Sequence, residues 1–252
     1  MKHVVTVLAL ALGLLAAGCG GDDEASETTT TTTAPVETAE IRVYFLREGK
    51  VWPVLREVDP AKGEASAAMA ALFQGPTAQE EADLDLSTAI PEAGEEAEVS
   101  IDDGVAAVQL DAELTDEGLA QVVYTLTQFP EVEQVEVQEG FATRADFEDQ
   151  TPAILVESPL AFEDVASALR VTGTANTFEA NFQYELTDTD GRIVDENFVT
   201  ATSGSGTRGT FDFTTDAYTV PFDGVGALIV YESSAEDGSR INLVEIPLRM
   251  TR

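Results

Sequence analysis

The stretch TDEGLAQVVYTLTQFPEVEQVEV, residues 115–137, predicts a helix that leads directly into a β-strand. Thr115 is a favourable N-cap, and the two acidic residues that follow it complement the helix dipole. The apolar side chains then repeat at helical spacing, at Leu119, Val122, Val123, Leu126 and Phe129. Pro130 ends the helix, and the residues from 132 to 137 have the composition of a strand.

The residues before this stretch alternate strand and helix signals. Two β-prone runs flank Glu48-Gly49 and predict a hairpin. A helix with one apolar face follows and ends at Gly75-Pro76. A second hairpin is predicted to turn through Asp102-Asp103-Gly104. The segments that carry these signals are 41–47, 51–56, 59–74 and 98–110. The resulting order, β-β-α-β-β-α-β over residues 40–141, predicts a compact α+β domain whose helices pack on one sheet.

The C-terminal part predicts an all-β immunoglobulin-like sandwich over residues 152–252, after a polar linker at 142–151. Its seven expected strands are 154–157, 169–175, 178–186, 192–200, 209–214, 227–232 and 241–250. From Phe178 to Leu186 every second residue is apolar, which predicts one buried face. The apolar parity switches between Leu243 and Val244, which predicts a bulge, and Pro247 belongs on an edge or at an unpaired position.

The N-terminus has the pattern of a secretory signal peptide over residues 1–18, with a positive head and a short apolar run. It ends in Leu15-Ala16-Ala17-Gly18-Cys19, which resembles a bacterial lipobox, so we expect lipidation of Cys19. The alternative is an ordinary cleaved signal followed by an incidental cysteine. Residues 19–39 are polar and threonine-rich, and they predict a disordered tether. The expected location is the outer face of the cell membrane.

Composition excludes several classes of function. The formal net charge is −34, the opposite of the basic footprint of a nucleic-acid binder. The one histidine, His3, leaves with the signal peptide, and Cys19 is the one cysteine, so triads and zinc sites built on these residues are excluded. No phosphate-binding glycine loop is present. We therefore expect no enzyme activity, no cofactor and no nucleic-acid partner.

A few motifs have two interpretations. Asp188 and Asp190, in Asp188-Thr189-Asp190-Gly191, are weak Ca²⁺ candidates, but a tight turn explains the motif as well. The segments 102–104 and 203–206 are interpreted as a turn and a flexible loop. Tyr44 and Trp52 lie on the first hairpin, where core packing is favoured over stacking on sugars or a partner.

The first domain resembles the GerM-type domain of bacterial sporulation and spore-germination proteins. The residues that carry this resemblance are Val43–Leu46, Leu72–Thr77, Ala89–Pro91 and Tyr124–Val137. The second domain is similar to the immunoglobulin-like module that often follows a GerM-type domain, at Val156–Pro159, Val171–Ala175, Phe178–Phe182 and Glu232–Ser239. The resemblance implies a surface-anchored, non-catalytic envelope protein, linked in spore formers to assembly or germination machinery.

The sequence thus favours a lipid-anchored binding or scaffold module. Its expected partners are the membrane, through the lipid anchor, and another envelope protein or a second copy of the chain, with peptidoglycan as a further option. The alternative is a protein that binds cell-wall glycan, a small ligand or a cation. A glycan hydrolase with two carboxylates is a remote third, because it needs a cleft with aromatic platforms around an acid of raised pKa.

Overall fold

The computed structural model of the 252-residue chain describes residues 38–91, 98–110, 112–138 and 140–252. The predicted signal peptide, Cys19 and nearly all of the predicted tether lie outside these described residues. The predictions made for them therefore stay predictions. No helix within the described ranges is long and apolar enough to cross a membrane.

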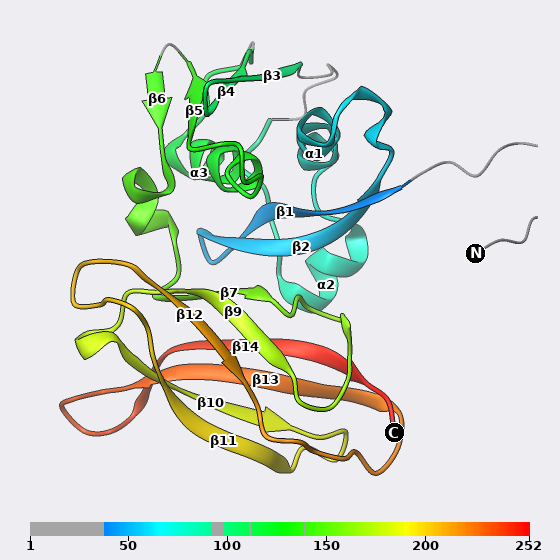
Figure 1. Ribbon diagram of the computed structural model, residues 1–252, viewed down its shortest axis with the longest axis vertical. Helices are drawn as coiled ribbons and strands as arrows, with labels where there is room; N and C mark the ends of the chain where they lie inside the picture. Colours follow the sequence, from blue (N-terminus) through cyan, green and yellow to red (C-terminus); the bar gives the residue numbers. More distant parts are fainter. Residues whose placement is uncertain (1–37, 92–97, 111, 139) are drawn as a thin grey trace, which may run out of the picture. The chain divides into compact units, whose positions relative to one another are not determined.

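The first domain begins with the predicted antiparallel hairpin (Figure 1). β1 (Ala39–Arg47) pairs with β2 (Lys50–Val58) along its whole length, and Phe45 faces Trp52 across the two strands. Glu48 and Gly49 in the turn have φ angles of 52° and 73°. Positive φ at both central residues gives a turn whose twist matches that of the flanking strands, which explains why this dipeptide closes the hairpin.

Three α-helices follow, and the sequence predicted two of them. They are α1 (Glu64–Phe73), α2 (Ala78–Leu84) and α3 (Asp116–Leu126), with a short 3₁₀ turn η1 (Pro60–Lys62) before α1. The additional helix is α2, which a capping box starts: Thr77 and Glu80 exchange hydrogen bonds between side chains and backbone N–H groups. Only Leu84 of α2 is buried, so the helix has no apolar stripe for sequence periodicity to reveal.

The remaining strands of the first domain form a separate sheet with the order β3-β4-β5-β6. Its members are β3 (Val99–Asp102), β4 (Val105–Val108), β5 (Gln134–Val137) and β6 (Gly140–Ala142). The α+β class of this domain is confirmed. The order β-β-α-β-β-α-β omitted α2 and β6, and the expectation of one sheet is corrected to two, because the hairpin of β1 and β2 pairs with neither end of the second sheet.

Side chains of α3 and of Gln128, just beyond the end of α3 at Leu126, close the free edge of β1. The Arg42 N–H donates to Gln128 Oε1 at 2.8 Å, and Gln128 Nε2 donates to the Arg42 carbonyl oxygen at 2.6 Å. The Tyr44 N–H donates to Thr125 Oγ1 at 3.1 Å, and Gln121 Nε2 donates to the Tyr44 carbonyl oxygen at 3.0 Å. The helix therefore supplies the hydrogen bonds that a neighbouring strand would otherwise make.

The segment 142–151, predicted as a linker, contains an ordered 3₁₀ segment, η2 (Arg144–Gln150). Phe147 is buried, and its carbonyl oxygen accepts a hydrogen bond from Thr151 Oγ1 at 2.7 Å. Thr151 Oγ1 also bonds the hydroxyl of Tyr124 at 2.7 Å. The segment thus packs on α3 instead of running freely between the two domains.

The second domain is the predicted β-sandwich, and its class is confirmed. One sheet has the order β12-β9-β7 and consists of β7 (Ile154–Ser158), β9 (Arg170–Ala175) and β12 (Gly209–Thr214). The other has the order β11-β10-β13-β14-β8 and consists of β8 (Asp164–Val165), β10 (Asn181–Thr187), β11 (Ile193–Thr200), β13 (Gly224–Ser233) and β14 (Arg240–Met250). Figure 1 shows the two sheets face to face.

The aromatic core joins the two sheets. Phe182 of β10 meets Phe211 of β12 with ring centres 4.9 Å apart, and Tyr184 stacks on Phe213 at 4.6 Å. The predicted buried face therefore holds from Ala180 onward, since Ala180, Phe182, Tyr184 and Leu186 are all buried. It is wrong for Phe178, which lies in the 3₁₀ turn η3 (Phe178–Ala180) and is 62% exposed.

The last strand carries the predicted irregularity. Val244 pairs with Val230, but the next paired residues are Ile241 and Glu232, so β14 has one more residue than β13 at this point. The expected bulge next to Leu243 is therefore present. Pro247 faces Ala227 of β13 on one side. On the other side β8 pairs only with Arg249 and Met250, so no strand there requires a backbone N–H at position 247, which proline lacks.

Candidate functional site

A cluster of polar side chains joins η2 to the first strand of the sandwich. Arg144 Nη1 lies 2.8 Å from Glu157 Oε1, and Arg144 Nε donates to Thr127 Oγ1 at 2.7 Å. The guanidinium also lies 4.6 Å from the ring centre of Tyr124. The hydroxyl of Tyr44 donates to the same Glu157 oxygen. One carboxylate of β7 thus connects β1 with η2, and Arg144 in turn contacts Tyr124 of α3.

Burial and charge set the protonation states in this cluster. Burial alone would raise the pKa of Glu157, but the positive charge of Arg144 and hydrogen bonds from Tyr44 and Arg144 hold that pKa below its ordinary value. Burial and the neighbouring Glu157 carboxylate raise the pKa of the Tyr44 hydroxyl. Glu157 is therefore ionised and Tyr44 is neutral near pH 7, which suits a structural ion pair and is the reverse of what a general acid needs.

A second polar contact lies at the other end of η2. The Glu148 carboxylate accepts two hydrogen bonds from Arg208, at 2.8 and 2.9 Å, and one from Asn176 Nδ2 at 2.8 Å. Hydrogen bonds from Arg208 lower the pKa of Glu148 and outweigh its partial burial. Lys50 Nζ, in β2, donates to the Asp149 carbonyl oxygen at 2.6 Å. Both domains therefore bind η2 through charged groups.

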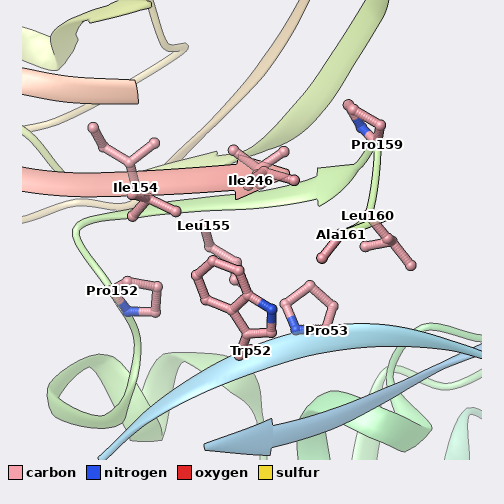
Figure 2. A pocket seen from close by; sticks show the side chains of 11 residues that line it. Trp52, Pro53, Pro152, Ile154, Leu155, Pro159, Leu160, Ala161 and Ile246 are labelled. Atoms are coloured by element: carbon pink, nitrogen blue, oxygen red, sulfur yellow. The ribbon is translucent and has the colours of Figure 1, made fainter. Parts of the chain in front are cut away.

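Trp52 of β2 and apolar residues of the sandwich enclose a small cavity (Figure 2). Its lining includes Pro53, Pro152, Leu155, Pro159 and Leu160. The cavity measures about 10 Å³, about the least space that can admit one water molecule. Trp52 is 7% exposed, and its Nε1 has no hydrogen-bond partner among the described residues. Trp52 and the fully buried Tyr44 are thus packing residues here and are inaccessible to a sugar or a partner.

An open groove of about 1100 Å³ lies on the first domain, between the end of β2, η1, α1 and the β3–β4 hairpin. Small side chains of α1 line part of it, at Ser66, Ala67, Ala70 and Ala71. Its charged lining carries both signs, at Arg56, Glu57, Asp59, Lys62 and Glu98. None of the described residues that line it is aromatic. The groove therefore lacks the aromatic platforms expected of a glycan-cleaving cleft.

The predicted site residues lie apart from these features. Asp188 is buried, and its Oδ1 accepts hydrogen bonds from the backbone N–H groups of Asp190 and Arg192, at 2.8 and 2.9 Å, as in a side-chain-capped turn. Asp190 lies 3.4 Å from the Arg192 guanidinium. In the described ranges no group of three or more His, Cys, Asp or Glu side chains could hold a metal ion. Cys19 lies outside those ranges.

Sequence reasoning missed Arg144, Glu148 and Glu157, which hold η2 to the two domains. Glu148 lies in a short acidic run with Asp149, and Glu157 is a single acid at the end of an apolar strand, so neither is distinctive in a chain with 47 acidic residues. One signal was available for Arg144 alone. It is the one cation between Phe141 and Gln150, a stretch that is otherwise acidic, so an ion pair with a nearby carboxylate could have been predicted for it.

The comparisons with known proteins agree with this architecture. Residues 42–140 match a family model described as "Sporulation and spore germination". Residues 153–239 match a second model, described as "Immunoglobulin-like domain of bacterial spore germination". No curated protein matches the chain.

Among solved structures, the chain is similar to the tandem GerMN domains of the sporulation protein GerM from Bacillus subtilis, with 24% identity and a TM-score of 0.32. That match covers 44% of this chain and 42% of the other, so the chain spans less than half of the solved protein. The two family models instead cover the two domains in sequence order. The chain therefore contains a domain of the sporulation and spore germination family, followed by the immunoglobulin-like domain of bacterial spore germination.

Proposed function

We propose that this chain is a lipid-anchored, non-catalytic binding or scaffold protein of the bacterial cell envelope that acts in sporulation or germination. The observation that carries the proposal is the pairing of two domains that both match families of spore germination. Both families describe non-catalytic modules of this process. The proposal adds the membrane anchor and the binding role to that family membership.

The anchor is supported by the sequence before the folded domains. A short apolar run ends in Gly18-Cys19, and Cys19 is the one cysteine of the chain. The polar residues that follow, up to the start of β1 at Ala39, would hold the folded part away from the membrane surface. In this arrangement the lipid provides membrane attachment and the two domains provide protein surface for partners.

The non-catalytic role is supported by the polar groups of the folded part. The pKa values of Glu157, Glu148 and Glu80 all lie below their ordinary value, each held there by an arginine against the effect of burial. A glycan hydrolase needs a carboxylic acid whose pKa is raised. The groove on the first domain, with its small side chains and mixed charges, is better suited to a polypeptide than to a stacked sugar ring.

The anchor is tested by membrane fractionation of cells that produce the tagged full-length chain. The wild-type chain is expected in the membrane fraction, and Cys19→Ala is expected to lose the lipid and to leave that fraction. Ser26→Ala, in the same polar segment, is the matched control and is expected to stay with the membrane. Equal membrane association of Cys19→Ala and the wild type contradicts the anchor.

The binding role is tested by chemical crosslinking in intact cells, with products identified by mass spectrometry. A crosslink to another envelope protein supports an adaptor, and a crosslink between two copies supports a self-assembling scaffold. Sporulating and germinating cultures are compared, because the proposal expects the crosslink in at least one of them. Crosslinks to no protein, with retention of the chain on purified peptidoglycan, would overturn the protein-partner role in favour of wall binding.

A further inference from the structure

Strand β11 forms an unpaired border of the five-stranded sheet (Figure 1). It pairs with β10 on one side, and no other described strand pairs with it. The backbone N–H of Phe198 donates to the side-chain Oδ1 of its neighbour Asn197 at 2.9 Å, which shows that this N–H is directed away from β10. The strand contains neither lysine nor proline, two residues that often protect such an edge, and its charged residues, Asp195 and Glu196, are acidic.

A concavity of about 240 Å³ lies beside this edge, on one face of the sheet. Three phenylalanines line it. Phe182 is buried, whereas Phe178 of η3 and Phe198 of β11 are 62% and 70% exposed. Gln183 of β10 lies directly opposite Phe198 in the strand register, so its side chain and the ring share one face. The alternation of apolar residues predicted Phe178 to lie in the core. Because Phe178 is exposed instead, its ring and that of Phe198 are both accessible to a ligand.

The charged groups of the concavity are both acidic. Glu179 and Glu232 line it, and none of the described lining residues is a lysine or arginine. The Glu232 carboxylate is held in place by hydrogen bonds from the Phe178 N–H and from Asn242 Nδ2, both at 2.8 Å. Arg240, which faces Ser233 in the strand register, is already paired with Glu185 of β10.

Aromatic faces beside carboxylates favour a cation. A lysine or arginine over a phenylalanine ring is attracted by the quadrupole of the ring, and the two carboxylates add direct charge attraction. The whole chain carries a net charge of −34, so a basic partner is attracted and an acidic one is repelled. Two phenylalanines would also contact the aliphatic stem of such a side chain.

We propose that β11 and the adjoining concavity of Phe178, Phe198, Glu179 and Glu232 bind an extended segment of a partner protein that carries a lysine or arginine. The segment adds to the edge of β11 as a further strand. A residue opposite Phe198 on the same face has its Cβ about 4.5–5.5 Å from that of Phe198, within reach of both rings for a long basic side chain. This inference deepens the proposed function by naming the partner's chemistry.

The test uses the purified full-length chain and two synthetic peptides. One peptide alternates lysine with valine, and the other has glutamine in place of each lysine. Calorimetric titration is expected to show binding of the lysine peptide and at least fivefold weaker binding of the glutamine peptide, about the contribution of one cation–π contact. Phe198→Ala and Glu179→Gln are each expected to weaken binding of the lysine peptide by about the same factor.

Phe141→Ala is the matched control, because Phe141 is a 63% exposed phenylalanine at the edge strand of the other domain, and it is expected to bind like the wild type. Hydrogen exchange adds a direct readout of strand addition, since the Phe198 amide is expected to exchange more slowly in the complex. Equal binding of the two peptides, or unchanged exchange at Phe198, overturns the proposal. Membrane anchoring and a role in germination do not enter this test, so its failure leaves the proposed function standing.

Discussion

Arg144 in η2 forms an ion pair with Glu157 in β7, with 2.8 Å between Nη1 and Oε1. The two side chains are 25% and 15% exposed, so each charge is largely removed from water and depends on the other. Tyr44 of β1 donates to the same carboxylate. The first domain, the connecting segment and the sandwich therefore share one buried charge cluster, and the two domains are expected to unfold together.

Arg144→Ala leaves the Glu157 carboxylate without its cation. We expect the free energy of unfolding to fall by about 3 kcal/mol, because removal of Arg144 leaves the negative charge of Glu157 unpaired in a poorly solvated place. Urea unfolding followed by circular dichroism measures this. The matched control is Arg170→Ala, whose ion pair with Asp212 is 69% and 53% exposed and whose loss is expected to leave the midpoint unchanged. Equal midpoints for Arg144→Ala and the wild type contradict a stabilising pair.

The same cluster predicts a loss of stability in acid. The pKa of Glu157 is lower in the folded chain than its ordinary value of about 4.3, so the folded state releases this proton more readily than the unfolded state. The stability that Glu157 contributes is fully present above about pH 4.3 and is lost as the pH falls through the folded pKa.

Glu157→Gln removes this titration, so its stability is expected to fall less steeply between neutral pH and pH values below about 4. Urea midpoints measured across that range compare the two proteins. Other carboxylates with lowered pKa values, such as Glu148 and Glu80, remain in both proteins and give a shared background slope. Parallel acid slopes in the two proteins would show that Glu157 is not linked to folding in this way.

Gln121→Leu opens the protected edge of β1. Gln121 is fully buried, its Nε2 donates to the Tyr44 carbonyl oxygen at 3.0 Å, and its Oε1 accepts from the Ala89 N–H at 2.8 Å. Leucine fits the apolar surroundings but leaves both backbone groups unpaired, so we expect a loss of about 3 kcal/mol in a denaturant titration. Gln79→Leu on the exposed side of α2 is the control, with an expected change below about 0.5 kcal/mol.

Gln121 also shows how far the sequence could predict this fold. Helix α3 and the strand after it were predictable, because the apolar spacing, the N-cap Thr115 and the helix-ending Pro130 are all local signals. The role of Gln121 was not, since a glutamine within an amphipathic helix has the same pattern whether it faces solvent or a strand edge. Its partners Tyr44 and Ala89 lie far away in the chain, and only the tertiary fold brings them together.

The candidate surface features also include one that the sequence could predict, the turn at Asp188, and one that it could not, the exposure of Phe178. The turn at Asp188 follows from local chemistry, and the structure shows the hydrogen bonds expected of such a turn. Phe178 was assigned to a buried face because it continues the alternation of β10, but positive φ angles at Glu179 and Ala180 break the strand there. Non-glycine residues with positive φ are uncommon, so periodicity alone could not place this ring on the surface.

Gly173 in β9 lies where both neighbouring strands approach the backbone closely. A Cβ at this position would lie 2.1 Å from the Leu155 carbonyl oxygen and 2.6 Å from Phe211 Cζ, at a place where β7 and β12 flank the strand. The backbone oxygen cannot move without breaking the ladder between β7 and β9, so Gly173→Ala is expected to lower the free energy of unfolding by about 3 kcal/mol. Gly140→Ala in β6 is the control, because its Cβ would approach no atom closer than 3.8 Å. Thermal unfolding of both variants measures this. An unfolding midpoint of Gly173→Ala equal to that of the wild type would contradict the close approach of β7 to β9 at this residue.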